Sequence, residues 1–475
     1  MKPTFATRWT ATAGRRHARG NAETRPEGAF HLEPRGTDAR GSVLILVLWI
    51  CLGLVALTLY FANSMNSSLR AADNRATETA ARQALQGGLR YASYVLKTHA
   101  VGGAVPDEDD YRAEALPVGD ARFWFVGRNT DEPTSNEVHF ALVDESSKLN
   151  LNTVTAAMLQ ALPLPDMTPD IATAIVAWRS AGGQGALFDS TYTQLDPPRT
   201  NKRAPFESID ELRLVYGATL DVLLGEDANR NGVLDASEDD GQDSAPRDDQ
   251  DGRLLAGLLE YVTVYSRQPA TGASGQRRLD IRTQQSRGQL LQRLTAAGFA
   301  QARAIQIVQA ANAAGGTYTS VAGFMLATQM TAEEYALVHT EFTAVDNGAA
   351  QGLVNVNTAS EAVLTAIPGI GAERAAAVVA YRLANRAALT SFHWLTLVLT
   401  PAQLRQAGPF ITDHSYQFSA DVVALGNNGR GYCREKAVFD VSAGSPRIVY
   451  RQDLSAYGWA LGAALRRSTR GTPDI

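Results

Sequence analysis

The stretch GSVLILVLWICLGLVALTLYFA, from Gly41 to Ala62, decides how this chain is organised. No charged residue occurs between Arg40 and Arg70. Roughly 20 consecutive apolar residues are enough for a helix to span a bilayer. The polar helical pattern that follows has no helix breaker before Gly87, so the sequence predicts one long helix, half in a membrane and half in water. The rest of the chain is then a body attached to that helix.

The bulk composition is that of ordinary globular protein, with 475 residues of which 45% are hydrophobic and 20% charged. This size predicts about two to four domains. Residues 1–41 hold eight Lys or Arg against four Asp or Glu, although the whole chain has a formal net charge of −5. The positive-inside rule therefore predicts that residues 1–41 are cytoplasmic and that the body lies on the opposite side of the membrane. An acidic body is a poor polyanion binder, because phosphate contacts need clustered Lys and Arg.

The two cysteines exclude a disulfide scaffold. Cys51 lies in the middle of the apolar stretch and Cys433 near the C-terminus, so the two cannot pair. The body must therefore fold by its hydrophobic core, with a metal ion as the remaining device for extra stability.

The residues before the apolar stretch do not form an ordinary secretory signal, because the apolar run is too long and no A-x-A site follows it directly. In Arg40-Gly41-Ser42, a basic residue and a Gly precede the small residue that opens the helix. This pattern resembles the processing site of type IV prepilins. The resemblance implies that a prepilin peptidase cuts between Gly41 and Ser42, leaving Ser42 as the mature N-terminus. A plain signal anchor with an incidental Gly is the alternative.

Position five of the implied mature chain is Leu46, whereas most pilins and pseudopilins have Glu there. The lack of Glu resembles one subclass, the K-type minor pseudopilins of the type II secretion system. The leader is longer than is usual for pilins, so the true start of the chain stays open.

The body begins and ends with elements that a pilin-like α/β fold needs. Ser64–Lys97 carries apolar residues at three- and four-residue spacing, which predicts the water-exposed half of the long helix. Alternation and β-branched or aromatic residues predict five strands. The strand-like runs are 121–127, 137–145, 415–426, 435–442 and 446–453.

Between these strands a motif of the form (L/V)-N-(L/V)-N-T occurs twice, in KLNLNT from Lys148 and GLVNVNT from Gly352. A short helix, a second helix and a segment with a neighbouring Phe and Ser follow each copy, PFES from Pro205 in the first and TSFH from Thr390 in the second. We expect Thr153 and Thr358 to be the N-cap residues of the short helices, because a hydroxyl can accept from a free N–H of the first turn. The sequence therefore predicts two related helical units inside the fold.

The second unit contains IPGIGAERAAAVV, from Ile367 to Val379, which resembles a helix-hairpin-helix motif. One interpretation is nonspecific DNA binding through the backbone N–H groups of the turn. The other is a packing unit similar to a sterile alpha motif, in which Gly only permits the turn. We favour packing, because the matching turn of the first unit, Leu162–Pro169, has no Gly and the body is acidic.

The sharpest motif is GEDANRNGVLDASEDD, from Gly225 to Asp240, which fills every position of the calcium loop D-x-N-x-N-G-x-x-D-x-x-E. Alternating oxygen ligands surround one hard cation, Gly232 permits the sharp turn, and a final Glu binds through both oxygens. A solvated acidic loop is the alternative. The predicted ligands are Asp227, Asn229, Asn231, Val233 through its carbonyl, Asp235 and Glu238.

A second ion is a further expectation, because several nearby carboxylates have no assigned role. The sequence does not decide among them. They are Asp239, Asp240, Asp243, Asp248, Asp249 and Asp251.

The chain shows no catalytic constellation. Its seven His residues form no H-x-x-x-H or H-E-x-x-H pattern, and there is no G-x-S-x-G, P-loop or dinucleotide fingerprint. We therefore expect no enzyme.

Together, the Gly-Ser junction, Leu46, the paired repeats and the calcium loop resemble the K-type minor pseudopilins, over nearly all of the chain after Arg40. The resemblance implies a non-enzymatic role at the tip of a pseudopilus in protein secretion. It also implies a Gram-negative inner-membrane location with a single span and a periplasmic body, and an N-methylated mature end. The implied partners are the I-type and J-type minor pseudopilins, other pseudopilins, the inner-membrane secretion platform and the prepilin peptidase, with no nucleic acid. A membrane-anchored DNA receptor and an uncut, adhesin-like anchored protein are the alternatives.

The expected fold class is α+β, with a long N-terminal transmembrane helix and a pilin-like antiparallel sheet that carries a large all-helical insertion. The expected segments are a leader at 1–41, the membrane and assembly helix at 42–100, the first strands at 101–147, the first helical repeat with the calcium loop at 148–250, a strand with further helices at 251–350, the second helical repeat at 351–412 and the last strands at 413–475.

Overall fold

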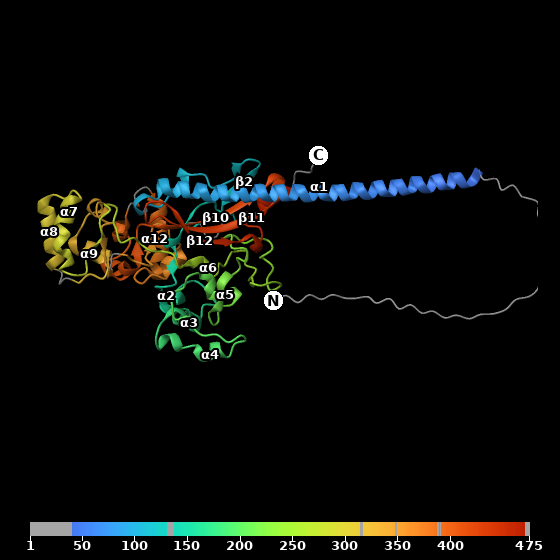
Figure 1. Cartoon of the computed structure of the whole chain (residues 1–475). Coiled ribbons are helices and arrows are strands. Elements are labelled where there is room, and N and C mark those ends of the chain that lie inside the picture. Colours follow the sequence, from blue (N-terminus) through green and yellow to red (C-terminus); the bar gives the residue numbers. More distant parts are fainter. Residues whose placement is uncertain are drawn as a thin grey trace, which may run out of the picture. The chain divides into compact units, whose positions relative to one another are not determined.

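The computed structural model describes residues 40–130, 137–313, 317–346, 349–386, 389 and 391–470. The chain divides into two compact units, residues 1–69 and 70–475. Residues 1–39 of the leader predicted at 1–41 lie outside the described residues. The fold is a mixture of helices and an antiparallel sheet, as expected (Figure 1).

The first helix, α1, runs without interruption from Arg40 to His99. In the first unit its apolar side chains are exposed; Leu44 and Trp49 are both 75% exposed. Among the described helices, α1 is the one long and apolar enough to cross a membrane. Exposed apolar side chains are costly in water and favourable in lipid.

In the second unit, α1 packs on one face of the sheet, and Ala84, Leu89 and Leu96 enter a core with Phe123 and Phe125. Two consecutive glycines, Gly87 and Gly88, weaken a helix, but α1 continues through both residues. Gly88 has a packing role. A Cβ atom there would lie 2.7 Å from Cγ1 of Val422 in the sheet.

The sheet joins strands from both ends of the body. Its order is β1-β2-β10-β11-β12, with β3 also paired to β10, and every pairing is antiparallel. The C-terminal strands confirm the sequence prediction, but the run 137–145 forms only the short β3 and one isolated bridge, Val126 to Phe140. The strands are β1 (Leu116–Val118), β2 (Ala121–Phe125), β3 (Val143–Asp144), β10 (Gln417–Leu425), β11 (Cys433–Asp440) and β12 (Arg447–Asp453).

A helical insertion separates β3 from β10, and it consists of three units rather than two. Each unit is closed by a two-stranded parallel pair, and the three share one hydrophobic core. The pairs are β4 (Leu149–Asn150) with β5 (Val262–Thr263), β6 (Leu279–Asp280) with β7 (Phe342–Thr343), and β8 (Val354–Asn355) with β9 (Ile411–Thr412).

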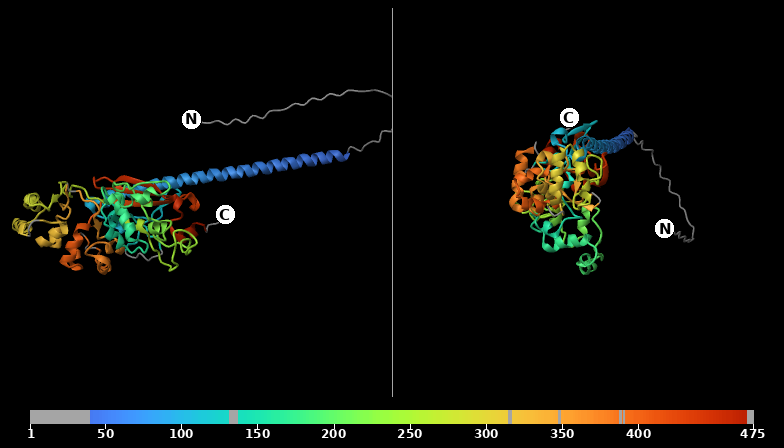
Figure 2. Two further views of the ribbon diagram at one scale, coloured as in Figure 1. Left: turned by 90° about the horizontal axis from the view of Figure 1, so that it is seen from below. Right: turned by 90° about the vertical axis from the view of Figure 1, so that its left-hand side faces the viewer.

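The helices of the insertion are short, and they lie in separate groups around the sheet. Helices α7 to α9 lie together at one end of the body, and α2 to α4 form another group (Figures 1 and 2). The helices of the three units are α2 (Ala156–Gln160), α3 (Pro169–Arg179), α4 (Asp189–Thr193), α5 (Leu220–Leu224) and α6 (Leu258–Tyr261); α7 (Leu290–Ala296), α8 (Gln301–Ala313), α9 (Val321–Thr328) and α10 (Ala332–Ala336); and α11 (Glu361–Thr365), α12 (Gly371–Ala384) and α13 (Pro401–Ala407). After β12 comes α14 (Gly462–Arg470).

The third helical unit, which lies between the two predicted ones along the chain, begins with LDIRT at Leu279. This sequence is a divergent copy of the L-N-L-N-T motif. The Asp280 carboxylate accepts from the Arg282 N–H at 2.9 Å. The Asn150 and Asn355 side chains make the same turn in the other copies, at 2.9 and 3.0 Å. An Asp or Asn at this position folds onto its own backbone two residues on. The shared turn identifies the motif where the letters differ.

The expected N-caps of the short helices are wrong by two residues. Thr155 caps α2 and Ser360 caps α11. The N–H of Thr153 donates to the Asn150 carbonyl at 3.0 Å, so this residue belongs to the turn that precedes the helix. Thr358 occupies the same place in the other copy.

Candidate functional site

The loop predicted to bind calcium follows α5 and returns to the start of α6. Gly225 closes its base in a left-handed conformation (φ 62°), paired with Ala256 as an isolated bridge. A Cβ atom at Gly225 would lie 2.1 Å from the Leu255 carbonyl oxygen. Only Gly fits this approach, so backbone meets backbone directly where the two ends of the loop join.

The carboxylates at the first and last predicted ligand positions turn into the loop. The Asp227 carboxylate accepts from the N–H groups of Asn231 and Gly232, both at 2.9 Å. The Glu238 carboxylate accepts from the N–H groups of Asn229 and Asp235, both at 3.0 Å. The chain therefore wraps around a centre that both carboxylates border.

The middle positions complete the ring of oxygen-bearing side chains. Both Asn229 and Asn231 donate through Nδ2 to the same Asp235 oxygen, at 2.7 and 2.9 Å. The N–H of Val233 donates to Asn231 Oδ1 at 2.9 Å. The Asn229 side-chain oxygen is buried and has no hydrogen-bond partner. The structure thus gathers the six predicted residues, and their coordination of an ion stays a prediction.

The buried carboxylates of the loop favour the binding of a cation, as their pKa values indicate. Burial raises the pKa of Asp227. Burial also raises the pKa of Glu238 to about 7, and the neighbouring carboxylates of Asp227 and Asp235 add to this rise. Buried carboxylates without a cation are costly, and a hard divalent ion with oxygen ligands removes that cost. These residues therefore fit calcium.

A second group of carboxylates lies beside the loop. Oxygens of Glu226, Asp248 and Asp249 lie within 4.8 Å of one another. One oxygen of Asp248 is buried without a partner. The sequence named Asp248 and Asp249 for a second ion but missed Glu226, because it precedes the calcium pattern. Its carboxylate accepts from the N–H groups of Leu255 and Asp249, at 2.7 and 3.2 Å.

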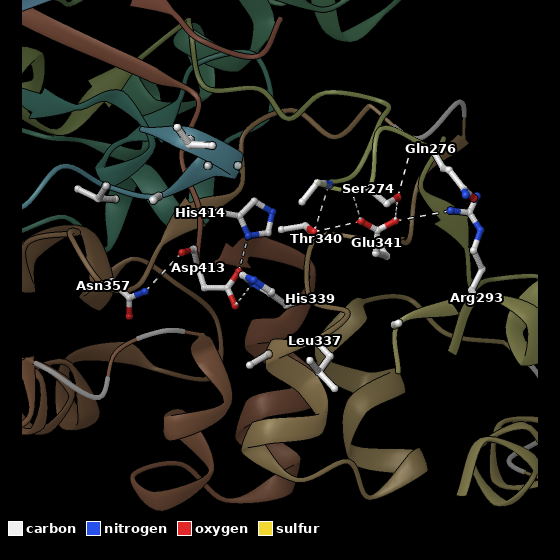
Figure 3. A pocket seen from close by; sticks show the side chains of 18 of the residues that line it. Ser274, Gln276, Arg293, Leu337, His339, Thr340, Glu341, Asn357, Asp413 and His414 are labelled. Atoms are coloured by element: carbon white, nitrogen blue, oxygen red, sulfur yellow. Dashed lines mark hydrogen bonds and ion pairs between the residues drawn. The ribbon is translucent and has the colours of Figure 1, made fainter. Parts of the chain in front are cut away.

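A different cluster borders a cavity of about 690 Å³ (Figure 3). Asp413, whose side chain is fully buried, lies between two histidines. Its oxygens are 2.5 Å from His414 Nδ1 and 3.3 Å from His339 Nδ1. The Phe392 N–H also donates to it, at 2.9 Å. The sequence offered no signal for this cluster, because its members come from separate helical units.

This cluster is a poor metal site. Arg278 places a guanidinium nitrogen 3.4 Å from His414 Nε2. His414 Nε2 therefore accepts a hydrogen bond from the guanidinium, and His414 Nδ1 carries the proton that faces Asp413. A metal on Nδ1 would instead require an N–H at Nε2, directed at a cation. The arrangement explains the low pKa of Asp413, to which the His414 and His339 rings contribute despite burial.

The hairpin has a left-handed backbone at Gly369 and Gly371 (φ 88° and 63°), a conformation that glycine adopts readily. The N–H groups of Ile370 and Gly371 both donate to the Ile367 carbonyl at 3.1 Å. A Cβ atom at Gly369 would lie 2.4 Å from the carbonyl oxygen of Gln403 in α13. This turn is therefore packed against the protein's own helix.

The proposed cleavage point, between Gly41 and Ser42, lies in the first turn of α1. The side chains of both residues lie outside the described part of the structure. The structure therefore leaves processing at this bond as a prediction.

Comparisons with known proteins give a match to a family model and a similarity to solved structures. The model of the helix-hairpin-helix motif matches residues 349–412, which form the helical unit closed by β8 and β9. No curated protein matches the chain. A solved structure similar to this chain is the crystal structure of the GspK-GspI-GspJ complex from the enterotoxigenic Escherichia coli type 2 secretion system. The alignment has 12% identity and a TM-score of 0.33, and it covers 82% of this chain and 98% of that chain.

Proposed function

We propose that this chain is a minor pseudopilin of the K type, which acts at the tip of a type II secretion pseudopilus. One observation carries the proposal: α1 begins at the Gly41–Ser42 junction, exposes apolar side chains along its first half, and packs its second half on an antiparallel sheet. Such a helix can rest in a membrane and later pack against neighbouring subunits. The role is mechanical, and it assigns no catalytic residue.

The tip position follows from two features. Leu46 replaces the Glu that, in other pseudopilins, neutralises the N-terminal amine of a neighbouring subunit. The helical insertion between β3 and β10 adds bulk that would block a subunit stacked above it. The proposed partners are the I-type and J-type minor pseudopilins, other pseudopilins and the inner-membrane platform. The proposed location is the inner membrane, with the body in the periplasm.

Calcium has a structural role in this proposal. An ion held by Asp227, Asn229, Asn231, the Val233 carbonyl, Asp235 and Glu238 would hold together a loop of buried carboxylates. A second ion would do the same for Glu226, Asp248 and Asp249. Both sites stiffen the part of the first helical unit that lacks regular secondary structure.

Sequencing the N-terminus of the protein from its membrane fraction tests the proposal. We expect Ser42 at the start, carrying an N-methyl group. A Gly41→Leu variant should keep its leader, because prepilin processing requires the Gly. Mature wild-type protein that retains residue 41 would contradict the proposal and favour the plain signal anchor.

DNA binding is a second candidate, and the helix-hairpin-helix match over residues 349–412 favours it. The packed turn at Gly369 and the acidic charge of the chain oppose it. An electrophoretic shift with duplex DNA at low and high salt decides between the two functions. Salt-sensitive binding that is lost in an Arg374→Glu variant would support the DNA receptor; no shift would support the pseudopilin.

A further inference from the structure

Two arginines, one buried and one partly buried, connect the predicted calcium loop to the antiparallel sheet. The first is Arg434 on β11, whose side chain is fully buried. Its guanidinium donates to the Asn229 carbonyl at 2.5 Å and to the Arg230 carbonyl at 2.7 Å. Asn229 lies 205 positions away along the chain. These bonds hold the loop backbone between the predicted ligands Asn229 and Asn231.

The charge of Arg434 is neutralised within the sheet. Its Nε and Nη2 atoms donate to the two oxygens of Asp421 on β10, at 2.9 and 2.6 Å. A bidentate pair of this kind fixes the plane of a guanidinium. Neutralisation also matters for a nearby cation, since an unpaired arginine would repel it. Arg434 can therefore orient the loop without opposing the binding of calcium.

The second arginine, Arg128, follows β2 and reaches the same point of the loop. Its Nη2 atom donates to the Arg230 carbonyl at 3.0 Å, and its Nε donates to Glu260 of α6 at 2.8 Å. A Cβ atom at Gly232 would lie 2.9 Å from Arg128 Cδ. The Arg230 carbonyl thus accepts from two guanidinium groups, and the sharp turn at Gly232 packs against one of them.

We propose that Arg434 and Arg128 are positioning residues that hold the loop in its ion-binding conformation and link calcium binding to the docking of the loop on the sheet. This inference rests on the proposed calcium site. Neither arginine offers an oxygen ligand, and both act through backbone carbonyls beside the ligands. Linkage is reciprocal, so calcium also stabilises the contact between the helical insertion and the sheet.

Calcium affinity of the full-length protein in detergent micelles, measured by calorimetric titration, tests the proposal. Groups that orient ligands typically change metal affinity by about 10- to 100-fold when removed. We expect a loss of that size in Arg434→Gln and in Arg128→Gln. The matched control is Arg451→Gln on the adjacent strand β12, which removes an arginine whose ion-pair partner is Glu435 and not a loop residue. This control should bind calcium as the wild type does.

A third variant separates position from charge. Arg434→Lys retains a cation for Asp421, but an ammonium group cannot face two carbonyls and a carboxylate in one plane. We expect its calcium affinity to fall while its secondary structure, measured by circular dichroism, stays unchanged.

The results test the proposed calcium site and the proposed linkage separately. If the wild type binds no calcium, the proposed calcium site fails. If the wild type binds calcium and both arginine variants bind it equally well, the linkage fails and the calcium site stands. If Arg434→Gln does not fold because Asp421 loses its partner, Arg128→Gln decides, since Glu260 keeps Lys148 at 3.9 Å.

Discussion

Gly88 of α1 lies so close to Val422 of β10 that a Cβ atom on the glycine would meet Cγ1 of the valine at 2.7 Å and a Phe123 ring carbon at 3.0 Å. The helix and the sheet therefore approach more closely here than any larger residue permits. We expect Gly88→Ala to lower the free energy of unfolding by about 1–3 kcal/mol through overpacking. This loss exceeds the gain of up to about 1 kcal/mol that Ala gives a helix.

A Gly53→Ala variant is the control for Gly88, because a Cβ atom at Gly53 has no neighbour within 4 Å. Chemical denaturation of both full-length variants in detergent gives the comparison. A Gly88→Ala protein as stable as Gly53→Ala would show that the helix and the sheet do not pack this closely.

Calcium should reverse the effect of Glu238→Gln on the stability of the folded protein. Its pKa is raised above that of an ordinary Glu, so the ionised side chain costs stability at pH above about 4.5 when no cation is present. In chelator at neutral pH, Glu238→Gln should therefore be at least as stable as the wild type. With calcium present it should melt at a lower temperature, because a ligand oxygen loses its charge.

Thermal melts with calcium and with chelator measure both effects. Asp227→Ala should lower the melting temperature more with calcium than in chelator, where only the acceptor of the Asn231 and Gly232 N–H groups is lost. Asp120→Asn, in the turn between β1 and β2, is the control substitution. Equal wild-type melting temperatures in the two buffers would count against a structural ion.

The pair His339–Asp413 should give stability that depends on pH. Asp413 raises the pKa of His339 above its usual value of about 6.5, although burial and Arg278 oppose the rise; Glu341 adds to it. The pair therefore stabilises the folded state fully below about pH 6.5, and this contribution is lost as pH rises through the folded pKa. Relative to His339→Asn, the wild type should be more stable near pH 6 and lose that advantage at alkaline pH.

Denaturation of both proteins between about pH 5.5 and 9 measures this difference. His393→Asn is the control. The His393 ring lies 3.0 Å from the carbonyl of Met330, which carries no charge, so this substitution removes no ion pair with that partner. A constant difference between wild type and His339→Asn over the whole range would remove the ion pair as its cause.

Short-range patterns explain what the sequence could predict. The periodicity of α1 and the alternation of β10 to β12 are local, and both elements appear where expected. The run 137–145 has the same alternation, but it forms only β3 at Val143–Asp144 and an isolated bridge at Phe140, because strand formation depends on partners that the pattern does not contain. The gathering of the six proposed ligands into one loop was predictable, since they lie within 12 consecutive positions, from Asp227 to Glu238.

Long-range contacts explain what the sequence could not predict. Arg434 and Asn229 are 205 positions apart, and nothing in either local sequence indicates their hydrogen bond. The third helical unit was hidden for a different reason. Asp280 and Arg282 stand where the other copies have Asn, so the letters differ although the turn is the same.

The shared turn predicts opposite results for isosteric substitutions in two copies of the motif. Asp280 makes the turn, and Asn would make it equally well, so Asp280→Asn should change the free energy of unfolding by less than about 1 kcal/mol after losing the ion pair with Arg282. Asn355 makes the same turn, but its Nδ2 donates to the buried Asp144 at 3.2 Å.

Asn355→Asp would place a second carboxylate against Asp144, whose pKa burial already raises to about 6. Two buried carboxylates in contact cannot both ionise without a large cost, so this variant should lose about 3 kcal/mol or more at neutral pH. Part of the loss should return near pH 5, where one carboxylate takes up a proton. Urea denaturation at pH 5 and 7 measures both variants, and a tolerated Asn355→Asp would show that the Asp144 carboxylate does not face this turn.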